Sequence, residues 1–360
     1  MRTAKTIVLG VAALSLAATS CNSCQRANPP ASPTPAGAAA KSCGERLTAT
    51  ATELDLGACE LSVADVEKLA SFPDLRILRV RHLPTSALAS LPKLTKLSDL
   101  TVGDPASAAS SAAIDDAGLT ALAKLPALRR LRLIRPDVTS AGVAVLAPLP
   151  VEVLELPGAA KVDDAVWPHL QKMGALRELD LSATAVTAKG ASELSGIPSL
   201  ERVSLPEAAL DDAALATLSL LPMLRAVNST ERGTISLRST KVTPAGLSTL
   251  SRFPWMTSLS LDALPVTDAS IASLAGLAGL KQLSLNATKL GDDGLAPLSK
   301  LANLEALELA GTMVTPSGLE HLAGLSKLAR LTLPCSCAKA PGAAAIASAR
   351  KIPVSDDCPR

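Results

Sequence analysis

Leucines recur along this chain in the pattern L-x-x-L-x-L, and the pattern returns at a fixed spacing. It opens at Leu176, Leu200, Met256 (where Met replaces the first Leu), Leu280, Leu304 and Leu328, and four of these five steps are 24 residues. Further copies open at Ala51, Leu75, Leu97, Leu128 and Val151, and one surrounds Ile235 and Leu237. A repeat of this length indicates a solenoid in which each repeat packs on its neighbours. We expect about twelve repeats with one strand each.

The second half of each repeat carries a helix signature. It reads V-T-x-x-G-L, as at 242–247 and 314–319. Thr or Asp stands where a side-chain oxygen can cap a helix, and Pro244 and Pro316 follow at the predicted first helical position. Other repeats place a capping residue there, namely Asp115, Asp163, Asp211 and Thr267. Paired aspartates resemble calcium ligands, but at helix starts capping and the helix dipole explain them better. These pairs are Asp115-Asp116, Asp163-Asp164, Asp211-Asp212 and Asp292-Asp293.

Two spacings predict how such repeats stack. Parallel strands lie about 4.8 Å apart, whereas neighbouring helices need about 8–10 Å. A stack of strand-helix repeats must therefore bend with its strands inside. The predicted fold class is α/β, an arc with a concave parallel sheet and short helices on the convex side.

These motifs resemble the leucine-rich repeat family over about four-fifths of the chain. The 24-residue helix-containing repeats are similar to bacterial repeats of the GALA type and to the repeats of F-box adaptors. The resemblance implies a right-handed solenoid that binds protein and has no catalytic role. One departure is that Thr stands where the family usually has Asn or Cys after the strand, at Thr184, Thr240, Thr288 and Thr312. Because Thr offers fewer hydrogen bonds than Asn, we expect a less regular curvature.

Composition agrees with a solenoid and disfavours nucleic-acid binding. Tyrosine is absent and aromatic residues make up 1% of the chain, so Leu, Val and Ala must form the core. The formal net charge is +2, and removing Arg2 and Lys5 with a leader peptide brings it to zero. Such a balance lacks the basic surface that nucleic acid requires.

The N-terminus predicts export. A basic start and an apolar run too short to span a bilayer read as a signal peptide over 1–20. The segment Ala18-Thr19-Ser20-Cys21 resembles a bacterial lipobox, which implies that Cys21 becomes the lipidated first residue of the mature chain. Residues 21–46 are rich in Pro and Ala and read as a tether. We expect a lipid-anchored protein of the bacterial cell envelope, periplasmic or at the outer surface; ordinary secretion is the alternative.

Cysteine positions favour an oxidising compartment. Of seven cysteines, six remain after lipidation of Cys21, and none lies between residues 59 and 335. This distribution predicts disulfides that cap both ends of the leucine-rich repeat domain, residues 47–334, with 335–360 as the C-terminal cap. The preferred pairs are Cys43 with Cys59, and Cys335 or Cys337 with Cys358. A metal site at Cys335-Ser336-Cys337 is disfavoured because its one-residue spacing lacks a nearby His, and Cys59 as a buried thiol is a further alternative.

The chain lacks the constellations of an enzyme. His82, His169 and His321 are separated by three or more repeats, so a solenoid keeps them apart. No phosphate loop, nucleophile elbow or HExxH motif occurs. Glu155 and Asp180 are expected at neighbouring strand positions, where one carboxylate can raise the other's pKa or help to bind a cation. We predict no catalytic residues, no cofactor, no metal and no small-molecule substrate.

The concave sheet is the expected binding surface. Its central column of inward-facing residues is charged in the first half and hydroxylic in the second. The expected partner-binding residues are Arg79, Arg81, Arg130, Arg132, Glu155, Glu178, Asp180, Ser236, Ser260 and Ser284. A basic patch beside an acidic one would orient a protein partner of complementary charge.

Two segments break the repeat, at 103–113 and 225–232, and we expect loops there that either contact a partner or are simply tolerated. The sequence thus predicts a lipid-anchored envelope protein that binds another protein through its concave face and does not bind nucleic acid. The alternatives are a structural spacer without a specific ligand, and an F-box-like or effector adaptor suggested by the repeat resemblance alone. The absence of an F-box-like helical region before residue 47 and the export signal disfavour the adaptor.

Overall fold

The chain divides into two compact units, Met1–Ala39 and Ala40–Arg360. The computed structural model describes residues 43, 47, 51–57, 61–83, 85–104, 114–334 and 354–356, all of which belong to the second unit. The predicted signal peptide, Cys21 and the first segment that breaks the repeat beyond residue 104 lie outside these residues.

The described strands form one parallel sheet whose strand order follows the chain from β1 to β14. The strands are β1 Glu53–Leu56, β2 Ile77–Val80, β3 Asp99–Val102, β4 Arg130–Leu133, β5 Val153–Glu155, β6 Glu178–Asp180, β7 Arg202–Ser204, β8 Ala226–Val227, β9 Thr234–Ser236, β10 Ser258–Ser260, β11 Gln282–Ser284, β12 Ala306–Glu308, β13 Arg330–Leu333 and β14 Val354–Asp356. The predicted α/β solenoid is confirmed.

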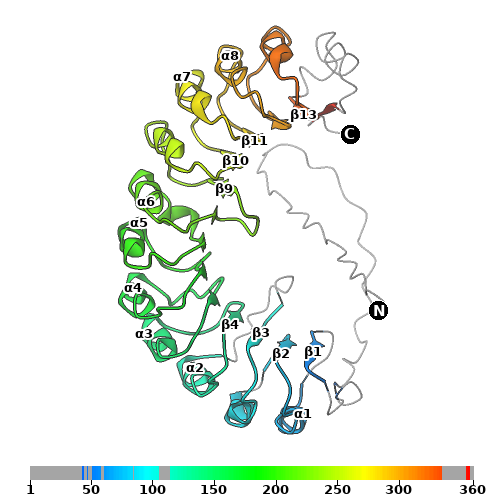
Figure 1. Ribbon diagram of the computed structural model, residues 1–360, viewed down its shortest axis with the longest axis vertical. Coiled ribbons are helices and arrows are strands. Elements are labelled where there is room, and N and C mark those ends of the chain that lie inside the picture. The colour runs from blue at the N-terminus through cyan, green and yellow to red at the C-terminus, as the bar shows by residue number, and fades with distance from the viewer. Residues whose placement is uncertain are drawn as a thin grey trace, which may run out of the picture. The chain divides into compact units, whose positions relative to one another are not determined.

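Short helices follow the strands and lie on one side of the sheet, with the strands on the inner side of the curve (Figure 1). The α-helices are α1 Val63–Leu69, α2 Asp116–Leu122, α3 Ser140–Val143, α4 Trp167–Leu170, α5 Ala188–Ala191, α6 Asp212–Leu218, α7 Asp268–Ile271 and α8 Leu295–Leu298. The 3-10 helices are η2 Thr85–Lys93, η3 Ala144–Leu146, η4 Asp164–Val166, η5 Ser192–Gly196, η6 Glu207–Ala209, η7 Gly246–Arg252, η8 Ala272–Gly276 and η9 Gly318–Gly324.

The repeated leucines form the core between the two layers. The middle leucine of each strand aligns with its counterpart in the next strand, as Leu78 does with Leu100 and Leu100 with Leu131. All three are fully buried. Because each leucine packs against equivalent leucines in both neighbouring repeats, these leucines become buried only when several repeats are stacked; a single repeat would leave them exposed.

Within the described residues the sheet has fourteen strands, more than the predicted twelve. One of the strands that the repeat pattern did not predict is β8. The segment 225–232, expected as a loop, begins with β8, which pairs with β7 and β9. No helix lies between β8 and β9, so this repeat is a strand and a short return loop. Helices α6 and η7 of the flanking repeats pack against each other instead. Periodicity missed β8 because the repeat is too short to contain the second half of the pattern.

The helix starts follow a more specific arrangement than simple capping. Asp115 and Asp211 each accept a backbone N–H from their own helix, as predicted. The second aspartate of the pair accepts from the next repeat: the backbone N–H and hydroxyl of Thr139 lie 2.8 and 2.7 Å from the two carboxylate oxygens of Asp116. The same two contacts join Asp164 to Thr187 and Asp212 to Thr243, and in the pair Asp292-Asp293 the first aspartate, Asp292, makes them with Thr315.

This cross-repeat contact changes the roles of Thr and Pro. Thr243 and Thr315 donate to the preceding repeat, and their helices η7 and η9 begin three residues later, at Gly246 and Gly318. The expectation that Pro244 and Pro316 occupy the first helical position was therefore wrong. Both prolines lie in the turn that precedes the helix.

The glycine of V-T-x-x-G is explained by the same carboxylate. A Cβ on Gly142 would lie 1.9 Å from Asp116 Oδ1, and one on Gly246 would lie 2.1 Å from Asp212 Oδ1. The motif glycine is thus needed because the aspartate of the previous repeat fills the space in front of it.

The threonines that replace the family's Asn each hold one strand-end carbonyl. The hydroxyls of Thr184, Thr240 and Thr288 donate to the carbonyl three residues earlier at 2.7–2.8 Å. Thr240 and Thr288 are buried. The single hydrogen bond per side chain agrees with the limit expected of Thr.

At the N-terminal end, Cys43 is fully buried and disulfide-bonded. Its partner, like every other cysteine, lies outside the described residues, so the pairing of Cys43 with Cys59 and those among Cys335, Cys337 and Cys358 stay predictions. None of the helices in the described part of the chain has the length and apolar character needed to cross a bilayer.

Candidate functional site

The central column predicted on the concave sheet is aligned as expected. Asp55, Arg79, Thr101, Arg132, Glu155, Asp180 and Ser204 are successive register partners from β1 to β7. Ser236, Ser260, Ser284, Glu308 and Thr332 continue from β9 to β13. The alignment follows from the period of two along each strand, which places the leucines in the core and these side chains on the concave face of the sheet.

Most of the predicted charged residues are paired within the sheet. Arg132 contacts Glu155 at 3.4 Å, Arg130 contacts Asp99 at 3.6 Å, and Arg81 contacts Asp104 at 3.3 Å. Glu178 pairs with Arg202, with nitrogen to oxygen distances of 3.2 Å. The basic and acidic patches are therefore less separate than the sequence indicated, because ion pairs join neighbouring strands.

Arg79 and Asp180 differ from Arg132 and Glu155, the paired residues of the central column. Neither forms an ion pair with another described residue. Arg79 is exposed and, with Arg81 and Thr101, lines a groove of about 250 Å³. Asp180 accepts the backbone N–H of Ser182 at 2.8 Å. Of the charge pattern predicted for the concave sheet, one cation and one carboxylate remain without an ion pair to a described residue, Arg79 on β2 and Asp180 on β6.

The neighbouring carboxylates Glu155 and Asp180 are brought together as predicted. Burial raises the pKa of Glu155, while Arg132 opposes that rise and Asp180 adds to it. Burial also raises the pKa of Asp99, opposed chiefly by Arg130. Within the described residues, no group of three or more His, Cys, Asp or Glu side chains has the geometry of a metal site.

The serine half of the column contains a hydrogen-bond network around Ser284. Its hydroxyl lies 2.5 Å from Asp262 Oδ1 and 3.1 Å from Glu308 Oε2. The Asn286 amide donates to Ser284 Oγ at 2.9 Å and to Glu308 at 2.8 Å. Ser260 and Ser284 line a shallow groove of about 150 Å³, and Ser236 aligns with Ser260 in the neighbouring strand.

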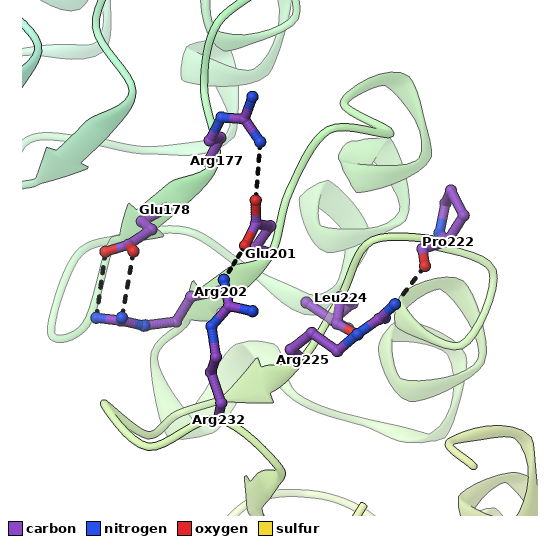
Figure 2. Close-up of polar contacts among 8 residues, drawn as sticks. All are labelled: Arg177, Glu178, Glu201, Arg202, Pro222, Leu224, Arg225 and Arg232. Carbon is purple, nitrogen blue, oxygen red and sulfur yellow. Dashed lines mark hydrogen bonds and ion pairs between the residues drawn. The ribbon is translucent and has the colours of Figure 1, made fainter. Parts of the chain in front are cut away.

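A second charged network, missed by the sequence analysis, holds the loop between β8 and β9. Glu201 accepts from Arg177 at 2.8 Å and pairs with Arg232 of the loop (Figure 2). These contacts lower the pKa of Glu201, with the Arg177 hydrogen bond as the largest cause. The guanidinium of Arg225 donates to the Pro222 carbonyl at 3.2 Å and also to that of Leu224. The signal in the sequence is the alternation of Arg and Glu one position before strands β4 to β8, at Arg129, Glu152, Arg177, Glu201 and Arg225.

The histidines occupy separate repeats. His82 follows β2, His169 lies in α4, and His321 lies in η9. His82 and His321 are exposed and His169 is half-buried. The structure brings none of them next to another.

Comparison with known proteins identifies the fold. No protein-family model and no curated protein sequence matches the chain. Among solved structures, an internalin of Listeria monocytogenes is 19% identical, with 86% of this chain and 87% of that chain covered and a TM-score of 0.57. A leucine-rich repeat protein of Leptospira interrogans is 17% identical, with 84% and 89% covered and a TM-score of 0.45. The match to the internalin, together with the single parallel sheet of repeated strands, shows that the chain has the leucine-rich repeat fold.

Proposed function

We propose that this protein is a non-catalytic protein-binding module and that its partner binds the concave sheet. The observation that carries the proposal is the central column, a row of exposed and half-exposed polar and charged side chains on twelve strands of one sheet, β1–β7 and β9–β13. A parallel sheet that is open on one face offers an extended surface, which solenoid proteins use for recognition. Arg79 is the preferred anchor because Arg is enriched at binding hot spots and this one has no ion pair with a described residue.

The binding experiment is affinity capture with the mature chain, comparing wild type with Arg79→Glu and Lys189→Glu. Lys189 is exposed on the convex helix α5, so Lys189→Glu makes the same charge change away from the sheet. We expect a partner that the wild type and Lys189→Glu retain and that Arg79→Glu loses. Arg132→Glu is a poorer probe, because it also breaks the pair with Glu155. Equal capture by all three folded proteins would remove Arg79 from the binding site.

The internal ion pairs favour a second candidate, a spacer that holds an envelope structure without a specific ligand. Arg130, Arg132 and Glu178 already have partners within the sheet, which reduces the charge left for another protein. An empty capture by folded wild type would support this alternative.

We also propose that the protein is exported and anchored to a membrane of the bacterial envelope through lipidated Cys21. The support is the sequence of the first 21 residues, with its basic start, short apolar run and lipobox-like ending. Mass spectrometry of the mature protein should show a diacyl or triacyl mass on Cys21, and Cys21→Ser should release the protein from the membrane fraction. An unmodified Cys21 in the membrane fraction would contradict the anchor.

A further inference from the structure

A groove of about 630 Å³ lies where β6, β7 and β8 end. Its lining includes Ser182 after β6, Ser204 at the end of β7, Pro206 and Glu207 after β7, and Asn228 after β8. The volume falls in the range of about 300–1,000 Å³ that is usual for ligand pockets. None of the residues predicted to bind a partner lines this groove, although Asp180 is the register partner of Ser204.

The groove borders the repeat of β8, which has no helix. In the other described repeats the chain continues from the strand to a helix, whereas after β8 it turns back to β9. Asn228 makes this turn in the left-handed region, with φ of 47°. Its side-chain oxygen accepts the Leu205 N–H at 2.8 Å, and its amide donates to the Leu205 carbonyl at 3.2 Å. The wall of the groove is thus held in place by its own hydrogen bonds.

The polar groups that face the groove are hydrogen-bond acceptors with capacity to spare. The hydroxyls of Ser182 and Ser204 and the carboxylate of Glu207 have no side-chain hydrogen bond or ion pair to any residue in the described part of the chain. Asp180 uses one carboxylate oxygen for the Ser182 N–H. Glu207 is exposed and Ser182 and Ser204 are half-exposed, so a partner can reach all three.

Three of the nearby cations are engaged by carboxylates other than those at the groove. Arg202 is held by Glu178 and Arg232 by Glu201 (Figure 2), and Arg132 is held by Glu155. Arg238 follows β9, one strand from Asn228 and two strands, about 10 Å, from the Ser204 and Glu207 side of the groove. An anion would face two carboxylates here, whereas a cation would be attracted.

We propose that this groove receives a lysine or arginine side chain from an extended segment of a protein partner. An ammonium has three donors and no acceptor, which matches the Ser182 hydroxyl, the Ser204 hydroxyl and the Glu207 carboxylate. The assignment rests on the proposed protein-binding function and adds the chemistry of one contact. It makes the repeat of β8 a specificity element, because, of the strands whose connections the structure describes, only β8 and β9 follow each other without a helix between them.

The test uses the full chain and an acetylated, amidated heptapeptide, Gly-Ser-Gly-Lys-Gly-Ser-Gly. A water-soluble carbodiimide condenses a protein carboxylate with the lysine amine of the peptide to form an amide, and the carbodiimide takes up the water that is lost and becomes a urea. A carboxylate that couples in this way must lie in contact with the bound lysine. We expect coupling mapped by mass spectrometry to concentrate on Glu207 and Asp180. The Arg peptide should compete with the Lys peptide, and the Glu peptide should not.

The matched variants are Glu207→Gln in the groove and Glu320→Gln on η9, both at exposed positions. Glu207→Gln should weaken binding of the Lys peptide about tenfold and Ser204→Ala about threefold, while Glu320→Gln leaves it unchanged. Coupling spread evenly over exposed carboxylates, or equal affinity of Glu207→Gln, would overturn the assignment.

The outcomes separate this inference from the proposed function. If a partner is captured through Arg79 while the Lys peptide ignores Glu207, the groove assignment alone falls. If Arg79→Glu has no effect on capture while the Lys peptide couples at Glu207, the groove stands and the Arg79 site falls.

Discussion

The contact between Asp116 and Gly142 allows a quantitative test of the cross-repeat arrangement. Gly142 lies in α3, and a Cβ there would lie 1.9 Å from Asp116 Oδ1 and 2.4 Å from its carboxyl carbon. Gly142→Ala must therefore displace the carboxylate. That displacement breaks the two hydrogen bonds that Asp116 accepts from Thr139, at 2.8 and 2.7 Å.

The expected free energies follow from these contacts. Hydrogen bonds to charged groups contribute about 1.5–3 kcal/mol each, and the partial exposure here places both at the low end, for a loss of about 3 kcal/mol. Alanine improves helix propensity by about 1 kcal/mol. Gly142→Ala should therefore destabilise the protein by about 2 kcal/mol and Asp116→Ala by about 3 kcal/mol. In the double variant the clash is gone, so the cost should be about 2 kcal/mol, against about 5 kcal/mol if the effects were additive.

The assay is guanidinium unfolding followed by circular dichroism, with hydrogen exchange of the Thr139 amide as the local measurement. Gly276→Ala is the control, because no atom lies within 4 Å of the added Cβ, and it should change stability by less than about 0.5 kcal/mol. Additive effects in the double variant, or a neutral Gly142→Ala, would refute the explanation of the motif glycine.

Three further predictions concern the loop and the strand ends. Because its arginine partners lower the pKa of Glu201, the carboxylate form is favoured in the folded protein, and the loop should stay anchored above the ordinary carboxyl pKa and be released only as the pH falls through the lowered pKa. Hydrogen exchange of residues 229–233, measured as a function of pH, checks this prediction. Release of the loop at or above the ordinary pKa would be the contrary result. Asn228→Ala should cost about 1 kcal/mol more than Asn228→Gly in urea unfolding, since Ala is strained at positive φ, and equal costs would count against that strain. Thr288→Val should destabilise by about 1–2 kcal/mol. Thr312→Val should cost less because its backbone N–H still bonds the same carbonyl, and calorimetry showing the reverse order would contradict this account.

The sequence pattern predicted the sheet well because one leucine period controls both burial and strand alignment. The central column from Asp55 to Thr332 could be written down before the structure, since each repeat advances the register by one strand. What periodicity could not reveal was β8. A two-residue strand without a following helix carries too few positions to show a pattern.

The charge pattern was predicted less well, for a reason that lies in side-chain reach. The sequence pattern placed Arg132 in a basic patch and Glu155 in an acidic patch. Their strands lie about 4.8 Å apart, which lets the two side chains form an ion pair. The roles of the aspartate pairs were half predicted. Asp115 caps its own helix as expected, but the partner of Asp116 lies in the next repeat, beyond the reach of a local capping rule.

The aspartate and threonine contacts also restrict how the chain can be shortened or lengthened. From Asp116 to Thr243, repeats that supply an aspartate alternate with repeats that supply a threonine: Asp116 with Thr139, Asp164 with Thr187, Asp212 with Thr243. Deleting the Thr139 repeat alone would place Asp116 against the aspartates 163–164, whereas deleting it together with the following repeat would place Asp116 against Thr187. In this part of the protein, the segment that can be duplicated or removed without setting carboxylate against carboxylate is a pair of repeats.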